Sequence, residues 1–236
     1  MFNLLSKHPN LKCHVSDLNS NLILAYVAIR DKVTELIDSL ENHAKKYQNN
    51  HSQYYYQIRE SEPTSQIEQV SKLIFLNKTC FNGLYRVNSK GKFNVPLGKY
   101  TNPNIINREN LLTVSRILQS SNIEFFCRDF EAILHDTKKG DFVYLDPPYQ
   151  PVSKTANFTS YTTRNFTDDD LERLAIIAEK LHFKGCKILI SNSKSKKVQN
   201  SFSSSIWKMK EVHVNRAINS NSKKRTGHSE ILIKNY

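Results

Sequence analysis

The sequence is poor in glycine and cysteine, and its cysteines follow no recognisable spacing. Only 6 of the 236 residues are glycine, and Cys13, Cys80, Cys127 and Cys186 form no C-x-x-C pair. Neither a disulfide framework nor a zinc site is expected from such a pattern. We therefore expect no metal and a reducing, cytoplasmic location.

Long apolar runs are also missing. The longest run near the start, Leu22 to Ile29, is broken by Tyr26 and falls well short of the roughly 20 residues that a membrane helix needs. Lys7 and His8 interrupt the first residues before the apolar region of a signal peptide could form. The sequence therefore predicts no membrane partner and no signal peptide.

Positive charge is what the chain has in excess. Lysine and arginine number 34 against 22 aspartate and glutamate, which gives a net charge of +12. This balance favours a polyanionic partner such as nucleic acid, although membrane-surface and ribosomal proteins share it. A hydrophobic content of 39% over 236 residues is enough for the core of one large domain, or of a domain with a lobe.

Apolar periodicity predicts alternating strands and helices, which is typical of an α/β sheet. A helical pattern opens at Asn19 and continues to Leu40, and Thr167 is a predicted helix cap. The chain becomes polar and tyrosine-rich after residue 47. Within this region a Ser-Lys-Gly turn predicts a hairpin, with Gly91 at the positive φ that the turn requires. The predicted strands are 11–16, 123–127, 142–145, 188–191 and two in the tail; further helices are 67–78 and 168–183; the hairpin arms are 84–88 and 92–95.

The stretch FVYLDPPY places an acid, two prolines and a tyrosine at the end of a buried strand. Proline has no N–H for a sheet ladder, so the strand stops after Leu145, and Asp146 faces the crevice where open α/β sheets bind ligands. Asp146 and the Pro147 carbonyl can grip a planar ring amine, while Pro148 stiffens the backbone and Tyr149 stacks on the base. A base reaches such a pocket only by leaving the helix. The alternative is a plain Pro-Pro turn that caps a strand.

Several segments together resemble the Dam-type DNA adenine N6-methyltransferases, which depend on S-adenosylmethionine and modify adenine in GATC. The segments are SDLNSNLILAY, FNGLYRVNSKGKFNVPLGKY, RDF, FVYLDPPYQPVSKTANFTSYTT, ILISNS and SEILI, in the order of that family. Motifs in register are stronger evidence than any one of them. The resemblance implies an enzyme that transfers a methyl group from S-adenosylmethionine to N6 of adenine in double-stranded DNA.

The resemblance also implies individual roles. Asp146, Pro147, Pro148 and Tyr149 would form the catalytic loop, with Asp146 also beside the cofactor. Asp17 would hold the cofactor's ribose hydroxyls, and Asp129, in RDF where the family usually has GDF, would face its adenine. Without the resemblance, Asp17 is only the cap of the following helix and Asp129 a turn residue.

For DNA, the resemblance makes Phe81 a wedge in the base stack with Asn82 beside it. Leu84, Arg86 and Pro96 would touch base edges, and arginine is the usual reader of guanine. The alternative places Phe81 and Leu84 in a core and leaves Arg86 solvated. The basic residues that could meet phosphates, or merely face solvent, are Lys194, Lys196, Lys197, Lys223, Lys224 and Arg225.

The expected fold is α/β: an incomplete Rossmann-like methyltransferase sheet, residues 1–46 and 117–236, with an inserted, mostly helical target-recognition domain, residues 47–116, that carries the hairpin. The sheet is expected to be incomplete because the family's strand with an F-x-G-x-G cofactor loop has no counterpart here. The loss of that strand would expose apolar surface. The side chains concerned are Phe2, Leu4, Leu5, Val143 and Leu145.

Two alternatives to a self-sufficient enzyme remain. The chain could be an inactive remnant that at most binds DNA. It could also be one half of a split methyltransferase that a separate N-terminal fragment completes. A cognate restriction endonuclease system is a further candidate partner.

Overall fold

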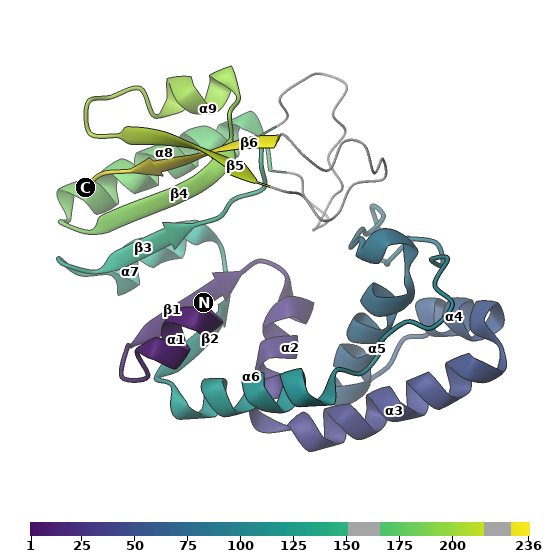
Figure 1. Ribbon diagram of the computed structural model, residues 1–236. Coiled ribbons are helices and arrows are strands. Elements are labelled where there is room, and N and C mark those ends of the chain that lie inside the picture. Colours follow the sequence, from purple (N-terminus) through teal and green to yellow (C-terminus); the bar gives the residue numbers. More distant parts are fainter. Residues whose placement is uncertain (151–165, 215–227) are drawn as a thin grey trace. The chain divides into compact units, whose positions relative to one another are not determined.

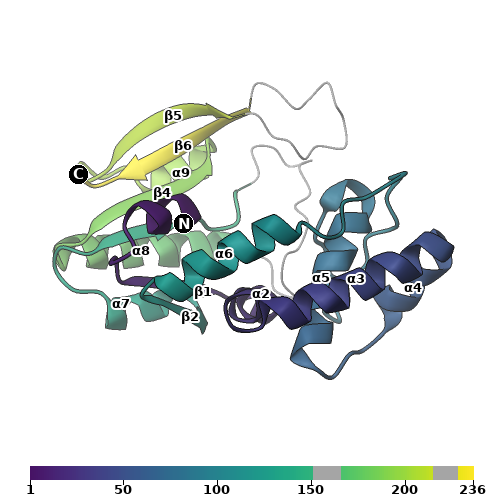
Figure 2. The ribbon, with the colours of Figure 1, turned by 60° about the horizontal axis from the view of Figure 1, so that its bottom comes forward.

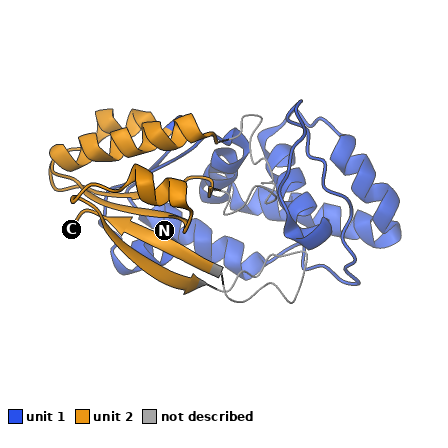
Figure 3. Ribbon diagram, turned by 90° about the horizontal axis from the view of Figure 1, so that it is seen from above, with its two compact units in different colours: residues 1–129, 161–163 blue, residues 130–160, 164–236 orange. Residues whose placement is uncertain are grey.

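The computed structural model describes residues 1–150, 166–214 and 228–236 (Figure 1). The chain forms two compact units, one of residues 1–129 and one that holds the described residues from Phe130 onward (Figure 3). Both units contain helices and strands, which confirms the α/β class. In the described ranges no helix is both long and apolar enough to cross a bilayer.

Unit 1 carries a sheet of two parallel strands. Strand β1 (Cys13–Asp17) pairs with β2 (Ile123–Cys127), and the register sets Asp17 beside Cys127. Both strands therefore end at the same edge. Leu5, Leu118 and Ile123 form a small core beside this sheet. The helices around it are α1 (Phe2–Lys7), α2 (Ser20–Asp31) and α6 (Arg108–Ser120).

The rest of unit 1 is helical, and Figure 2 shows α3 (Val33–Asn49), α4 (His51–Glu60) and α5 (Gln66–Thr79) gathered together. Their shared core includes Leu36, Leu40, Tyr47, Tyr55 and Phe75. Helix α5 confirms the helix predicted near 67–78. The single helix predicted from Asn19 to Leu40 was wrong, because Lys32 leaves the helical region at φ −139° and ψ 38° and separates α2 from α3.

The predicted hairpin is present only as a turn with isolated bridges. Val87 and Phe93 form one antiparallel bridge, and Gly91 has the positive φ of 74° that the turn requires. Regular strands do not form, because the Asn88 side chain accepts from the backbone N–H groups of Lys90 and Lys92. Such local side-chain bonds compete with a strand ladder.

Unit 2 is built on a four-stranded sheet in the order β3-β4-β6-β5. Strands β3 and β4 are parallel, and β6 runs antiparallel to both β4 and β5. The strands and helices are η2 (Phe130–Ala132), α7 (Ile133–Asp136), β3 (Phe142–Leu145), α8 (Asp168–Phe183), β4 (Lys187–Ser193), α9 (Lys196–Ser201), β5 (Lys208–Val214) and β6 (His228–Lys234).

Helix α8 covers one face of this sheet. Thr167 caps it as predicted, since its hydroxyl accepts from the N–H of Asp170, whose carboxylate accepts from the N–H of Thr167. This capping box fixes the start of the helix. The apolar residues that α8 and the sheet share are Val143, Leu145, Leu171, Leu174, Ile177, Ile188 and Ile190.

The expected exposure of apolar side chains was right only in part. Leu4 is 47% exposed, but Leu5, Val143 and Leu145 are 1%, 3% and 7% exposed, so the prediction was wrong for these three. Their own units bury them, Leu5 in the core beside the two-stranded sheet and the other two in the core that contains α8. The large exposed side chains of β3 point to its other face, where Phe142 and Tyr144 are 54% and 53% exposed.

Candidate functional site

The DPPY loop follows β3 directly. The strand ends at Leu145, and Asp146 is exposed, whereas Pro147 is buried and Pro148 exposed. The side chain of Asp146 points to the same face as Tyr144, because successive side chains of a strand alternate between faces. The sequence placed both the strand end and the loop correctly.

A chain of hydroxyl groups leads to Asp146. The Ser191 hydroxyl donates to Oδ1 of Asp146 at 2.6 Å, and the Tyr144 and Ser191 hydroxyl oxygens are 3.0 Å apart. Ser191 lies on β4, whose register pairs Leu145 with Ile190 and so brings Ser191 level with Asp146. Oδ2 of Asp146 has no hydrogen-bond partner within the part of the chain that the structure describes.

Tyr149 is held from a different strand. Its hydroxyl donates to Oε2 of Glu230 on β6 at 3.0 Å. Burial is the main cause that raises the pKa of Tyr149 to about 12; the neighbouring Ser191 hydroxyl opposes the rise, and Glu230 and Asp146 add to it. The phenol is therefore neutral at physiological pH, and its ring is held in place by a bond at the far end.

The end of the loop is bound to β4 through Gln150. The backbone N–H of Gln150 donates to Oδ1 of Asn192 at 3.1 Å, and the Ser193 hydroxyl donates to the carbonyl of Gln150 at 2.5 Å. Gln150 and Asn192 are 4% and 0% exposed. The loop is thus fixed to one strand at both ends, at Asp146 and at Gln150.

Sequence reasoning gave no role to four of these residues, namely Ser191, Asn192, Ser193 and Glu230. A signal was present, because three consecutive polar residues end an otherwise apolar strand in ILISNS. All three are buried. Buried polar groups need partners, and such a run therefore indicates a structured polar neighbour.

The structure brings Asp17 and Asp129 to one edge of unit 1. Asp17 ends β1, and Asp129 follows the end of β2 by two residues; both side chains are half-buried. Oδ1 of Asp17 accepts from the N–H of Asn19 at 2.7 Å, but Asp17 is not the cap of α2: the cap is Asn19, whose side chain accepts from the N–H groups of Asn21 and Leu22. Oδ2 of Asp17 has no hydrogen-bond partner in the described ranges. Asp146 lies in unit 2, so the carboxylates divide between the two units.

Three of the predicted DNA-binding residues lie together at the end of α5. Phe81 is 37% exposed and donates its backbone N–H to the carbonyl of the exposed Pro96 at 2.8 Å. Asn82 follows with a φ of 54°, in the left-handed region that few residues other than glycine adopt. This turn leaves the Phe81 ring outside the core, which is the opposite of the core alternative.

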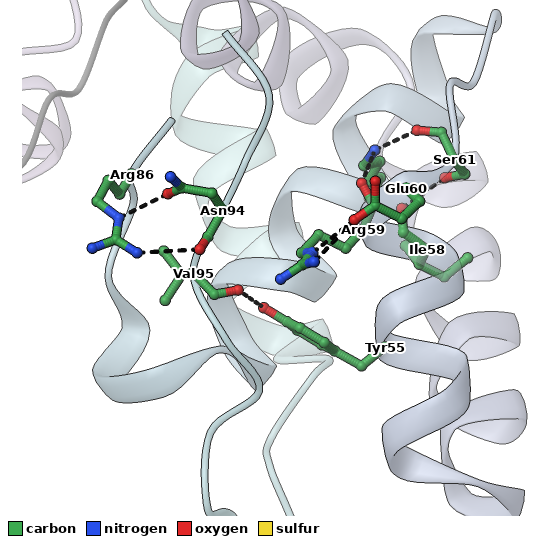
Figure 4. A network of polar contacts seen from close by, with 9 residues as sticks. Tyr55, Ile58, Arg59, Glu60, Ser61, Arg86, Asn94 and Val95 are labelled. Carbon is green, nitrogen blue, oxygen red and sulfur yellow. Dashed lines mark hydrogen bonds and ion pairs between the residues drawn. The ribbon is translucent and has the colours of Figure 1, made fainter. Parts of the chain in front are cut away.

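Arg86 and Leu84 occupy different surroundings (Figure 4). Arg86 is exposed, and its Nε and Nη2 donate to the side chain and the carbonyl of Asn94 at 2.7 and 3.2 Å. The neighbouring Val95 carbonyl accepts from the buried hydroxyl of Tyr55 at 2.9 Å, which ties the hairpin to α4. Leu84 is half-buried against the helical core, as its core alternative had it.

Two of the three lysines of unit 2 that were predicted to contact phosphates form ion pairs with acidic side chains. Lys194 pairs with Glu211 at 2.5 Å, and Lys197 pairs with Asp168. Lys196 is exposed. The predicted phosphate contacts at Lys223, Lys224 and Arg225 lie outside the described residues.

Comparison with known proteins gives consistent matches over most of the chain. The model of a family described as D12 class N6 adenine-specific DNA methyltransferase matches residues 1–218. The type II methyltransferase M.MjaIII of Methanocaldococcus jannaschii is 39% identical over 250 residues, which cover 100% of this chain and 84% of the relative. The type II methyltransferase M1.LlaDCHI of Lactococcus lactis subsp. cremoris is 37% identical, over 95% of this chain and 80% of the relative. A DNA adenine methylase of Escherichia coli (strain K12) is 32% identical, over 92% and 77%.

Proposed function

This chain belongs to the D12 class N6 adenine-specific DNA methyltransferase family, and we propose that it methylates N6 of adenine within GATC in double-stranded DNA, with S-adenosylmethionine as the donor. The observation that carries the proposal is the DPPY loop, fixed at the end of β3 with one carboxylate oxygen of Asp146 held and the other available. The relatives named DNA adenine methylase support adenine as the methylated base, and GATC as the site rests on the resemblance of the recognition hairpin to the Dam-type enzymes.

Asp146 and the Pro147 carbonyl then act as paired acceptors for the adenine amine. The amine is a poor nucleophile, because its lone pair is delocalised into the ring. Two fixed acceptors hold its N–H groups and favour a tetrahedral nitrogen whose lone pair is free to attack. The two prolines and the bonds at Gln150 keep the acceptors in place before the substrate arrives. The Tyr149 ring stacks on a base that has left the helix.

We propose that the adenosine half of the cofactor binds at the edge where β1 and β2 end. There Asp17 would accept from the ribose hydroxyls through its available Oδ2, and Asp129 would face the adenine. Carboxylates at the ends of adjacent parallel strands suit such hydroxyls in dinucleotide folds. S-adenosylmethionine, when bound, supplies an electrophilic methyl group on a sulfonium. Asp146, in unit 2, is the third residue proposed to contact the cofactor.

DNA recognition is assigned to residues 47–116 as a target-recognition domain. Phe81 is the side chain proposed to enter the base stack, with Asn82 beside it, and its exposure supports this role. Leu84, Arg86 and Pro96 are proposed to contact base edges. The net charge of +12 suits a polyanionic partner. We place the reaction in the cytoplasm, a reducing compartment that suits four free cysteines.

A partner that adds a strand to β3 is a second candidate. Among the described strands β3 bonds only to β4, and the side chains of Phe142 and Tyr144 on this strand are 54% and 53% exposed. An open strand edge is a template for pairing with another chain. A separate fragment that carries an F-x-G-x-G loop would then complete a split enzyme. The type II names of two relatives favour a cognate restriction endonuclease system as well.

The test is incubation of the purified chain with labelled S-adenosylmethionine and a GATC duplex, alone and with a peptide that carries an F-x-G-x-G strand. We expect labelled N6-methyladenine, absent from the Asp146→Ala variant and from a duplex with a scrambled site. Dependence on the peptide would identify the split enzyme. No label from folded protein in either arm would contradict the proposal, and a GATC-dependent gel shift without methylation would then identify an inactive DNA-binding remnant.

A further inference from the structure

We propose that Ser191, supported by Tyr144, is a positioning residue that fixes the Asp146 carboxylate with Oδ1 engaged and Oδ2 directed to the substrate amine. The proposal rests on the proposed function, since it concerns the orientation of the same carboxylate. It adds a part of the site that lies outside the DPPY motif, on a strand some 45 positions further along the chain.

The placement follows from sheet geometry. Parallel pairing sets Tyr144 beside Leu189 and Leu145 beside Ile190, so Asp146 and Ser191 are the next pair in register. Side chains two positions apart in a strand share a face, which puts the groups of Tyr144, Asp146 and Ser191 on one side of the sheet. The hydroxyls therefore reach the carboxylate without any rearrangement of the backbone.

The direction of donation follows from the proton count. A carboxylate accepts only, and the single hydroxyl proton of Ser191 is used at the 2.6 Å contact with Asp146. The Tyr144 hydroxyl, 3.0 Å away, must then donate to Oγ of Ser191. The order is Tyr144 to Ser191 to Asp146, and each donor strengthens the next by polarisation.

Burial makes Ser191 the rigid member of this chain. Ser191 is 3% exposed, and Asn192 and Ser193 beside it, at 0% and 3%, hold the backbone of Gln150. The terminal torsion of an aspartate is otherwise broad and nearly two-fold, so an untethered carboxylate would present its oxygens in several orientations. A buried donor on an interior strand selects one of them before substrate binds, which lowers the ordering left for the transition state.

The kinetic test compares Ser191→Ala and Tyr144→Phe with the wild-type chain. We expect kcat to fall about tenfold in Ser191→Ala and about threefold in Tyr144→Phe. KM for DNA should be nearly unchanged, because the lost bonds orient Asp146 and do not bind substrate. The double variant should be no slower than Ser191→Ala alone, since Tyr144 acts through Ser191. Matched controls are Ser115→Ala, an equally buried hydroxyl on α6 at 2% exposure, and Tyr236→Phe, an exposed phenol at 42%; both should match the wild type.

A second pair of variants separates positioning from damage to the core. Ser191→Thr keeps the hydroxyl and Ser191→Val has nearly the same shape without it, so any steric damage is common to both. Ser191→Thr should be the faster enzyme by about tenfold. Equal rates for the two, or a wild-type kcat in Ser191→Ala, would overturn the proposal.

A crystallographic comparison distinguishes failure of this inference from failure of the proposed function. The Asp146 carboxylate should have one orientation in the wild type and more than one in Ser191→Ala. If the wild type methylates no DNA, the proposed function fails, and the carboxylate orientation still decides the positioning role. One unchanged orientation in Ser191→Ala would overturn it.

Discussion

The hydroxyl of Tyr149 donates to Oε2 of Glu230 at 3.0 Å, although the strands β3 and β6 near these residues are not neighbours in the sheet. Tyr149 follows β3 and Glu230 lies on β6, with β4 between the two strands in the sheet. The ring is thereby anchored at its far end, while its faces are left for contact with a base.

Two substitutions at Tyr149 should separate the stacking of its ring on a base from the hydrogen bond of its hydroxyl to Glu230. Tyr149→Ala loses the ring, and we expect kcat/KM to fall about 10- to 100-fold, since base stacking on an aromatic ring contributes about 1–3 kcal/mol. Tyr149→Phe keeps the ring and should lose only about threefold. Steady-state methylation of a GATC duplex measures both.

Glu230 provides the matched control for this prediction. Glu230→Gln retains an acceptor oxygen and should behave as the wild type, whereas Glu230→Ala should resemble Tyr149→Phe. Full activity in Tyr149→Ala would show that no base stacks on this ring.

Arg86 should determine site preference rather than overall affinity. Arg86→Lys keeps the charge but not the planar fork that reads guanine, so the preference for GATC over a scrambled duplex should fall about 10- to 100-fold. Competition binding measures the ratio. Lys90→Ala, which removes an exposed charge in the hairpin turn, should weaken binding to both duplexes alike. An unchanged ratio in Arg86→Lys would mean that Arg86 does not read bases.

Tyr55 should stabilise the helical part of unit 1 through its buried hydroxyl. Tyr55→Phe leaves the Val95 carbonyl without its 2.9 Å donor, and we expect the free energy of unfolding to fall by about 1–3 kcal/mol in urea. Its neighbour Tyr56 is 38% exposed, and Tyr56→Phe should change stability by less than about 0.5 kcal/mol. Equal stability of the two variants would contradict this assignment.

His43 should make unit 1 sensitive to acid. Burial, with a smaller effect of Lys46, lowers the pKa of His43 to about 4, and Glu68 opposes the change. The unfolded chain binds this proton near pH 6.5, so between about pH 6.5 and 4 the unfolded state holds more protons and stability falls as pH falls. Urea unfolding at pH 7 and pH 4.5 measures the loss.

The comparison needs a variant that cannot titrate. His43→Asn replaces the titratable ring, whose two nitrogens bond to the Tyr54 and Ser71 hydroxyls at 2.8 and 3.3 Å, with a polar side chain that does not titrate, and it should show a weaker pH dependence. His8→Gln removes an exposed histidine and should leave the wild-type dependence intact. The same slope in His43→Asn and the wild type would rule His43 out as the source.

Local patterns predicted the elements that local chemistry determines. Strand β3 and helix α8 have the predicted bounds, because proline ends the one and a capping box starts the other. Contacts that depend on strand register could not be predicted from the sequence, because nothing near Ser191 indicates that it lies beside Asp146 in the sheet. The break at Lys32 was missed for a related reason: apolar spacing continues through it, and only the backbone angles of Lys32 reveal the change of direction.

Strand β4 is an interior strand, bonded along both edges to β3 and β6, and it supplies the groups that hold Asp146 and Gln150. Amide protons on such a strand exchange with solvent only when the whole cooperative unit opens, whereas loops usually exchange through local fluctuations. The DPPY loop is therefore held by a strand whose amide protons we expect to be among the slowest to exchange in unit 2. Its geometry should last as long as that unit stays folded, and solvent exchange at its anchoring strand should report the lifetime of both.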